Sequence, residues 1–178
     1  DVHQEHIIVG NGAAELIKYL VERHEGKLGC IRPTFEEYPN RCRPDDVACF
    51  WPQNENFAYD ADDVTEFFKD KDISMLVLIN PDNPSGNYIG KAELLRIADW
   101  CEAMGIRMIA DESFADFADE EDNSLIDEAI LNAHPHLVVV KSISKSYGVP
   151  GIRLGVLASA DEALIAGMKK DAAIWNIN

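Results

Sequence analysis

Short runs of consecutive apolar residues alternate along the chain with longer segments in which apolar residues recur at helical spacing. In the first longer segment, Leu16, Ile17, Leu20 and Val21 lie three or four positions apart, which predicts one apolar helix face. The apolar runs predict strands at 6–9, 27–31, 47–51, 74–79, 106–111, 137–140 and 153–159. The longer segments predict helices at 10–24, 60–70, 91–104 and 161–170, and a loop running into a helix at 118–132.

Strands made of continuous apolar runs are typical of a sheet whose two faces are both covered by helices. Strands that alternate with helices also favour parallel pairing, because a parallel neighbour requires a crossover connection. We therefore predict an α/β fold, a three-layer αβα sandwich around a mostly parallel mixed sheet. No repeat or linker divides the chain, so residues 1–178 are expected to form one domain.

Polar clusters follow four of the predicted strands. GNGAA follows HIIV, NPDNPSGN follows SMLVLI, DESFADF follows IRMIA, and KSISK follows LVVV. Ligands of open α/β sheets bind at the carboxyl ends of the strands. The four clusters are therefore expected to converge on one edge of the sheet, where they would form a single site.

The polar clusters contain groups that suit a phosphate. GNGAA is a strand-to-helix turn in which the backbone amides of Gly12, Ala13 and Ala14 could face an anion. It has Glu15 where a dinucleotide fingerprint has its third glycine, so a plain turn is an equal alternative. Further donors at the same edge favour a bound phosphate, namely the hydroxyls of Ser142 and Ser144 and the guanidinium of Arg153.

Each of four further side chains, taken alone, has more than one possible role. Lys145 could hold a phosphate, act as an amine nucleophile or simply be solvated. Asp111 could cap a helix, bind a metal or pair with a protonated ring nitrogen. Asn83 could cap a rigid turn or bind a phenolic oxygen, and Phe35 could belong to the core or cover a ring face. Taken together, these parts match one ligand, pyridoxal phosphate.

The charge balance limits the partners. Lys and Arg total 16 and Asp and Glu total 32, a formal net charge of −16. We therefore expect no binding to nucleic acid or to an anionic membrane surface, both of which require basic patches. The four cysteines form no Cys-x-x-Cys pair, and the sequence shows no signal peptide or membrane-spanning run. These features predict a cytoplasmic protein. We expect no metal site, because His134 and His136 lack a convincing third ligand.

The motifs NPDNPSGN, ADESFADF and SISKSYGVPGIRLG resemble those of fold-type I pyridoxal-phosphate enzymes of the class I/II aminotransferase family. Within that family the chain is most similar to the branch of histidinol-phosphate aminotransferase and threonine-phosphate decarboxylase. The resemblance runs from GNGAAE to WNIN. It implies an aspartate-aminotransferase-like large domain that binds pyridoxal 5'-phosphate.

The resemblance also implies roles for individual residues. Lys145 would form a Schiff base with the cofactor and then move the substrate α-proton, and Asp111 would keep the ring nitrogen protonated. Asn83 would bind the ring oxygen and Phe35 would stack on the ring. The phosphate would be held by Gly12, Ala13, Ala14, Ser142, Ser144 and Arg153. Tyr38 is compatible with either the substrate side or the core.

Two features depart from the family pattern. Phe114 stands where many relatives have a tyrosine that touches the ring oxygen, and it favours the threonine-phosphate decarboxylase branch slightly. The N-terminal arm and C-terminal small domain of the family are absent, so we expect the chain to be a fragment of a longer enzyme. Such enzymes build their sites across a dimer, which implies a homodimer for the full-length protein.

The resemblance implies an aminotransferase that moves an amino group between an amino acid and a 2-oxo acid. A decarboxylase on the same scaffold is the nearest alternative. A further alternative is the ligand-sensing, aminotransferase-like domain of a transcription regulator.

Overall fold

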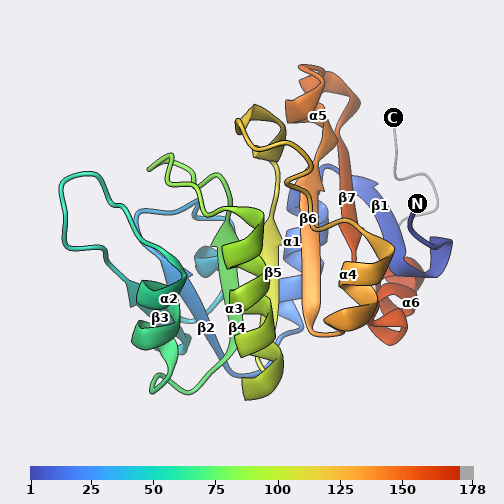
Figure 1. Ribbon diagram of the computed structural model, residues 1–178. Coiled ribbons are helices and arrows are strands. Elements are labelled where there is room, and N and C mark those ends of the chain that lie inside the picture. The colour runs from blue at the N-terminus through green and yellow to red at the C-terminus, as the bar shows by residue number, and fades with distance from the viewer. Residues whose placement is uncertain (173–178) are drawn as a thin grey trace.

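The computed structural model describes residues 1–172, so the WNIN motif lies outside the described residues. Its strands are β1 (Ile7–Asn11), β2 (Lys27–Ile31), β3 (Val47–Phe50), β4 (Ile73–Ile79), β5 (Arg107–Asp111), β6 (Leu137–Ser142) and β7 (Leu154–Ala158). The helices are α1 (Ala13–Glu22), α2 (Ala61–Phe68), α3 (Lys91–Met104), α4 (Glu128–Ala133), α5 (Ile143–Ser146) and α6 (Glu162–Asp171), as Figure 1 shows. These elements agree closely with the predicted ones.

The strands form one sheet in the order β1-β7-β6-β5-β4-β2-β3. The pairs among β2, β3, β4, β5 and β6 are parallel, whereas β7 is antiparallel to both β1 and β6. The predicted mostly parallel, mixed sheet is therefore confirmed. Because β7 runs in the opposite direction, it begins at the edge where β1 and β6 end. Asn11 lies opposite Leu154, and Ser142 lies opposite Gly155.

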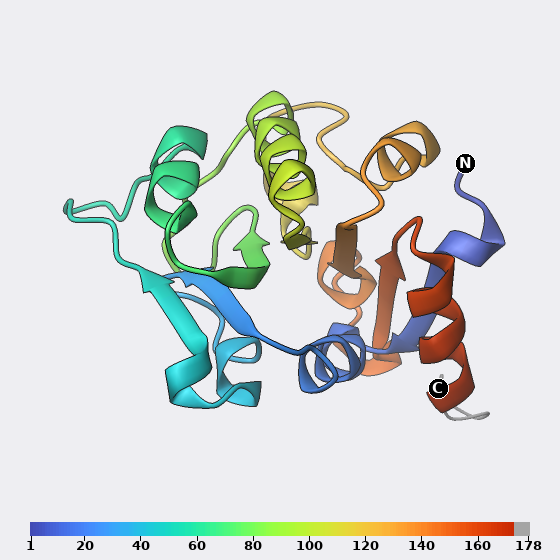
Figure 2. The same cartoon turned by 90° about the horizontal axis from the view of Figure 1, so that it is seen from below.

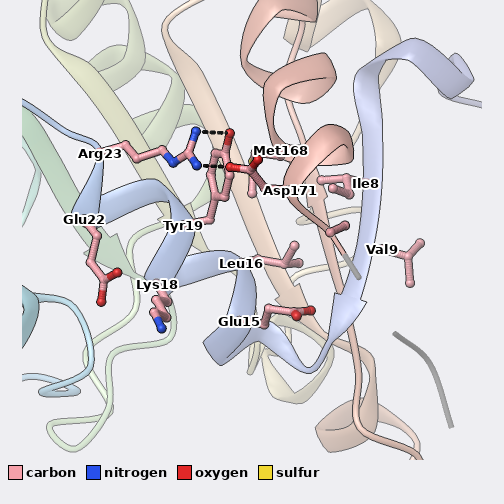
Figure 3. Close-up of a pocket in the computed structure, with 11 residues that line it drawn as sticks. Ile8, Val9, Glu15, Leu16, Lys18, Tyr19, Glu22, Arg23, Met168 and Asp171 are labelled. Atoms are coloured by element: carbon pink, nitrogen blue, oxygen red, sulfur yellow. Dashed lines mark hydrogen bonds and ion pairs between the residues drawn. The ribbon is translucent and has the colours of Figure 1, made fainter. Parts of the chain in front are cut away.

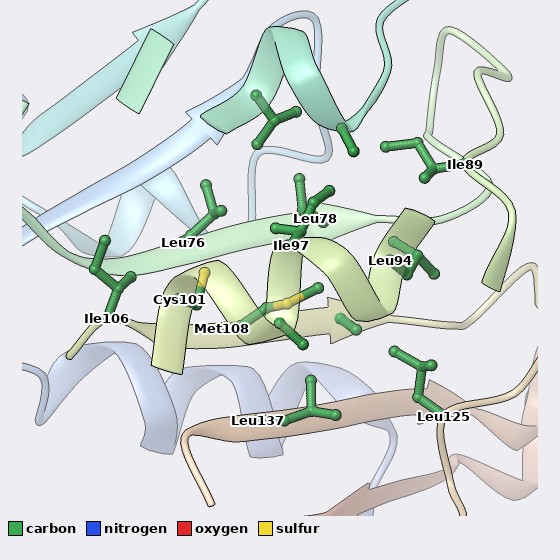
Figure 4. Packing of buried hydrophobic residues seen from close by; sticks show 14 of the residues in the cluster. Leu76, Leu78, Ile89, Leu94, Ile97, Cys101, Ile106, Met108, Leu125 and Leu137 are labelled. Atoms are coloured by element: carbon green, nitrogen blue, oxygen red, sulfur yellow. The ribbon is translucent and has the colours of Figure 1, made fainter. Parts of the chain in front are cut away.

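Helices cover both faces of the sheet, which confirms the αβα sandwich (Figure 2). Residues of α2, α3 and α4 pack on one face together with Leu76 and Leu78 of β4. Figure 4 shows the part of this cluster in which Leu94 and Ile97 of α3 lie over the sheet. Residues of α1 and α6 pack on the other face together with Met75 and Val77 of the same strand. This alternation follows from the two-residue period of a strand whose two faces are both buried. Among the helices of residues 1–172, none has the length and apolar character that a membrane span requires.

The close approach of α1 to β7 depends on a glycine. A Cβ built on Gly155 would lie 2.3 Å from the backbone nitrogen of Ala13, a distance that no side chain can occupy. The start of α1 can therefore rest directly on the start of β7. This packing brings the turn after β1 beside the chain that enters β7, and so positions two of the predicted site segments against each other.

Candidate active site

The predicted site residues lie at one edge of the sheet, which we call the carboxyl edge: the end at which β1, β4, β5 and β6 finish. It is the upper end of the molecule in Figure 1, where α5 follows β6. Lys145 lies in α5, and Asp111 is the last residue of β5. Arg153 precedes β7 directly, and Gly12 follows β1. The antiparallel direction of β7 is the reason that Arg153 reaches this edge.

The amine of Lys145 lies beside two aromatic rings. Its Nζ is 4.3 Å from the ring centroid of Phe114 and 5.5 Å from that of Phe35. Cation–π attraction at these distances holds an ammonium over the ring faces. Within residues 1–172 Lys145 has no carboxylate partner. The three predicted residues are thus brought together, with the amine next to apolar surface.

Asp111 is a buried carboxylate, with 2% of its surface exposed. Its Oδ2 accepts a hydrogen bond of 2.7 Å from the hydroxyl of Tyr38, and its Oδ1 accepts one of 2.9 Å from the backbone nitrogen of Ser113. Burial, followed by the negative charge of Asp111, raises the pKa of Tyr38 far above its usual value. Tyr38 therefore keeps its proton and remains a donor to Asp111.

The guanidinium of Arg153 lies against the turn after β1. A Cβ built on Gly12 would be 2.8 Å from Nη2 of Arg153, and Gly12 has a φ of +78° that favours glycine. Arg153 itself has a φ of +48°, an uncommon left-handed conformation for a residue with a side chain. Gly12, the residue before α1, has no side chain that could cap the helix, and its own amide donates to the Gly10 carbonyl at 2.8 Å. Within residues 1–172, the amides of Ala13 and Ala14 and a guanidinium without a carboxylate partner form a donor set suited to an anion.

The two predicted serine ligands differ in their surroundings. Ser142 is buried, and its backbone nitrogen donates to the hydroxyl of Ser113 at 3.1 Å. The hydroxyl of Ser144 accepts a hydrogen bond of 2.9 Å from the backbone nitrogen of Leu154. Ser144 thus holds α5 to the start of β7, and a contact of its hydroxyl with a phosphate stays a prediction.

Asn83 and Phe114 line an open cavity of about 450 Å³ together with Tyr88 and Phe117. The loop that carries Asn83 is held by the buried side chain of Asn80. The amide oxygen of Asn80 accepts from the backbone nitrogen of Ile89, and its amide nitrogen donates to the Ile89 carbonyl, both at 2.8 Å. Two hydrogen bonds to one residue fix the ends of the loop, which places Asn83 at the carboxyl edge.

Three residues that shape this edge were not predicted in that role: Tyr38 and Ser113, which bond Asp111, and Asn80, which holds the loop of Asn83. The sequence left Tyr38 between the substrate side and the core, and it singled out neither Ser113 nor Asn80. The sequence gives no local signal that Tyr38 is buried, because Glu36, Glu37 and Asn40 beside it are polar. Its bond to Asp111 depends on strand order. The contacts of Ser113 and Asn80 involve backbone atoms, which leave no trace in the residue pattern.

A separate hollow of about 370 Å³ runs along α1 between β1 and α6 (Figure 3). Arg23 closes one part of it by pairing with Asp171, and its Nη1 donates to the hydroxyl of Tyr19 at 2.8 Å. None of the predicted site residues is among the described residues that line this hollow. The candidate site is therefore the carboxyl edge.

Comparison with known proteins agrees with this geometry. The chain is 35% identical to the L-serine phosphate decarboxylase of Sulfurospirillum multivorans, over 99% of this chain and 46% of that protein. It is 30% identical to the threonine-phosphate decarboxylase of Salmonella typhimurium, over 97% of this chain and 47% of that protein. The crystal structure of the histidinol-phosphate aminotransferase from Clostridium acetobutylicum superposes with a TM-score of 0.82 at 26% identity, covering 97% of this chain and 51% of that one.

The chain thus spans about half the length of the curated relatives it matches. A family described as aminotransferase class I and II matches residues 1–177, which is nearly the whole chain. This match supports pyridoxal phosphate as the cofactor. The motifs, the sheet order and the similarity over almost every residue agree, and the chain belongs to the class I and II aminotransferase family.

Proposed function

We propose that residues 1–178 are the cofactor-binding domain of a longer, pyridoxal-phosphate-dependent enzyme that acts at the Cα of an amino acid. The observation that carries this proposal is the convergence of three groups at the carboxyl edge. They are the amine of Lys145, the buried carboxylate of Asp111 and the guanidinium of Arg153.

The donor set fits the phosphate end of the cofactor. Arg153 would pair with the phosphate, and the amides of Ala13 and Ala14 would donate to it at the positive end of the α1 dipole. The amide of Gly12 donates to the Gly10 carbonyl at 2.8 Å, so its contact with the phosphate stays a prediction. Ser142 would add a hydroxyl from the end of β6. An anion there would neutralise Arg153, whose charge no carboxylate of residues 1–172 balances.

The remaining residues fit the ring end. When bound, pyridoxal phosphate supplies an aldehyde for amine chemistry and a ring that accepts electrons from Cα. Asp111 would hold a proton on the ring nitrogen, Asn83 would donate to the ring oxygen, and Phe35 would cover one ring face. Lys145 would carry the covalent link and, once released, would move the substrate α-proton through its Nζ.

We propose transamination between an amino acid and a 2-oxo acid as the reaction of the parent enzyme. Decarboxylation of a phosphorylated amino acid is the second candidate. It is favoured by Phe114, which supplies no hydroxyl beside Lys145, and by the similarity to the serine-phosphate and threonine-phosphate decarboxylases. The two reactions differ in the Cα bond that breaks, and substrate-binding segments beyond this chain would select it.

The first experiment is borohydride reduction of the protein with pyridoxal phosphate, followed by peptide mass mapping. We expect the pyridoxyl group on Lys145. Lys145→Ala should abolish this adduct, whereas Lys141→Ala should retain it, because Lys141 lies four residues earlier and pairs with Asp116 at 2.9 Å. An adduct on another lysine, or none on the full-length protein, would overturn the proposal.

Product analysis of the full-length parent then separates the two reactions. A transaminase converts its amino acid to a 2-oxo acid and leaves pyridoxamine phosphate on the protein. A decarboxylase releases carbon dioxide and an amine. Phosphoserine and phosphothreonine are the first substrates to try for decarboxylation. We also predict that the parent enzyme is cytoplasmic and forms a homodimer. Measuring the molecular mass of the parent in solution would test the homodimer.

A further inference from the structure

Tyr38 is a tyrosine whose whole side chain is buried, yet its hydroxyl meets a charged group. Its relative exposure is 0%, and its hydroxyl donates to Oδ2 of Asp111 at 2.7 Å. A hydroxyl that is buried without a hydrogen-bond acceptor lowers the stability of the folded protein by about 1–3 kcal/mol. Here the acceptor is the carboxylate at the end of β5, and so the position of one side chain depends on the other.

The ring of Tyr38 is itself held firmly. It belongs to the buried cluster formed by α1, α6 and their face of the sheet. It also meets Phe35 edge to face, with ring centroids 6.5 Å apart and an interplanar angle of 78°. A close-packed ring has little freedom to move its hydroxyl. The segment PTFEEY thus carries both Phe35 beside Lys145 and a fixed donor to Asp111.

Both oxygens of Asp111 are anchored, from different directions. The Oδ1 atom accepts from the backbone of Ser113, and the Oδ2 atom accepts from Tyr38. The terminal torsion of an aspartate is broad, so a carboxylate held at one oxygen could still rotate. Each oxygen keeps lone-pair capacity after one hydrogen bond. The anchored carboxylate can therefore still accept from a ring N–H in a defined orientation.

We propose that Tyr38 is a positioning residue that fixes the Asp111 carboxylate for contact with the cofactor ring. This inference rests on the proposed function, because it assumes that Asp111 faces that ring. Tyr38 acts only through Asp111 and touches neither substrate nor cofactor. Its raised pKa keeps the hydroxyl protonated, so the donor is present throughout the physiological pH range.

The test is a double-mutant cycle on pyridoxal phosphate affinity, measured by absorbance titration rather than by activity. Tyr38→Phe should weaken binding by about tenfold, the range of one hydrogen bond to a charged group. Asp111→Asn should weaken it at least as much, and adding Tyr38→Phe to Asp111→Asn should cause no further loss. Tyr19→Phe is the matched control and should leave the affinity unchanged, because its hydroxyl bonds Arg23 in the separate hollow.

Unchanged binding by Tyr38→Phe, or losses that simply add in the double variant, would overturn the role of Tyr38 alone. A wild-type protein that binds no cofactor would instead overturn the proposed function and this role with it. The contact can also be observed without cofactor by proton NMR. We expect the hydroxyl proton of Tyr38 to exchange slowly with water and its chemical shift to change in Asp111→Asn. This test does not depend on Tyr38→Phe, so it holds even if that variant folds poorly. A signal that does not move would show that the two side chains are not bonded.

Discussion

The two edges of the sheet carry similar polar residues in different states. At the amino edge, where β4, β5 and β6 begin, two basic side chains pair with carboxylates. Arg107 bonds Asp161 at 2.7 Å, and His136 bonds Glu102 at the same distance. At the carboxyl edge, Lys145 lies between aromatic rings and Arg153 lies on a glycine turn.

This difference is informative because the chain is so acidic. With a net charge of −16, a surface cation has many carboxylates within reach. Within residues 1–172, neither Lys145 nor Arg153 has such a partner. The lack of a partner does not mark a site by itself, because Lys71, just before β4 at the amino edge, lies over the ring of Phe67 and has no carboxylate partner among residues 1–172 either. Lys145 and Arg153 differ from Lys71 in lying at the edge where the parallel strands end, which is where ligands of such sheets bind.

The largest expected effect comes from removing one arginine at each edge. Arg153→Ala should weaken pyridoxal phosphate binding by roughly 10- to 100-fold, because hydrogen bonds to a charged group contribute about 1.5–3 kcal/mol. Arg107→Ala should leave that affinity unchanged and lower the free energy of unfolding by about 1 kcal/mol, since its ion pair is only partly exposed. Cofactor titration and urea denaturation measure the two effects. If Arg107→Ala weakened cofactor binding as much as Arg153→Ala, the assignment of the binding site to the carboxyl edge would be contradicted.

A smaller effect should follow from two glycines that both have a positive φ. Gly12 at the carboxyl edge has a φ of +78° and a ψ of 162°, and Gly105 after α3 has a φ of +67° and a ψ of 26°. Alanine at either position should cost at least about 1–2 kcal/mol of unfolding free energy, because a positive φ crowds Cβ. Only Gly12→Ala should also weaken cofactor binding, by several-fold, since its Cβ would displace Arg153. Gly105 has open space around it, so an affinity loss in Gly105→Ala would argue against this explanation.

The smallest effect concerns Glu112, the buried carboxyl next to Asp111. Burial raises its pKa, although hydrogen bonds from Ser124 and Leu125 oppose the rise. A raised folded-state pKa contributes stability that is full below the unfolded value and is lost as pH rises through the folded value. Glu112→Gln removes this dependence. Between about pH 4 and 7, the unfolding free energy of wild type should therefore fall relative to the variant as pH rises.

Urea denaturation of both proteins across that pH range measures the difference. A constant gap between the two proteins would mean that Glu112 does not titrate there. The comparison also bears on the site, because Ser124 and Leu125 tie the loop before α4 to the end of β5.

Much of the fold could be predicted because burial leaves a local periodicity. The strand at 27–31 and the helix at 91–104 have the observed bounds. The segment 118–132 was less clear, since its helix begins only after Asp127, whose carboxylate caps Ala129 and Ile130. A single cap sets that boundary, and such contacts have no periodic signature. The convergence of the polar clusters also followed from local order, through the rule that parallel strands end at one edge.

Strand order and direction decided the rest. No residue pattern states that β7 runs antiparallel, yet this direction alone brings Arg153 to the turn at Gly12. Likewise, Tyr38 meets Asp111 only because the chain after β2 passes beside the end of β5. Apolar periodicity reports which side of an element is buried, since burial acts on each element separately. Contacts between distant segments depend on how the elements are stacked, and that is a property of the packed sheet as a whole.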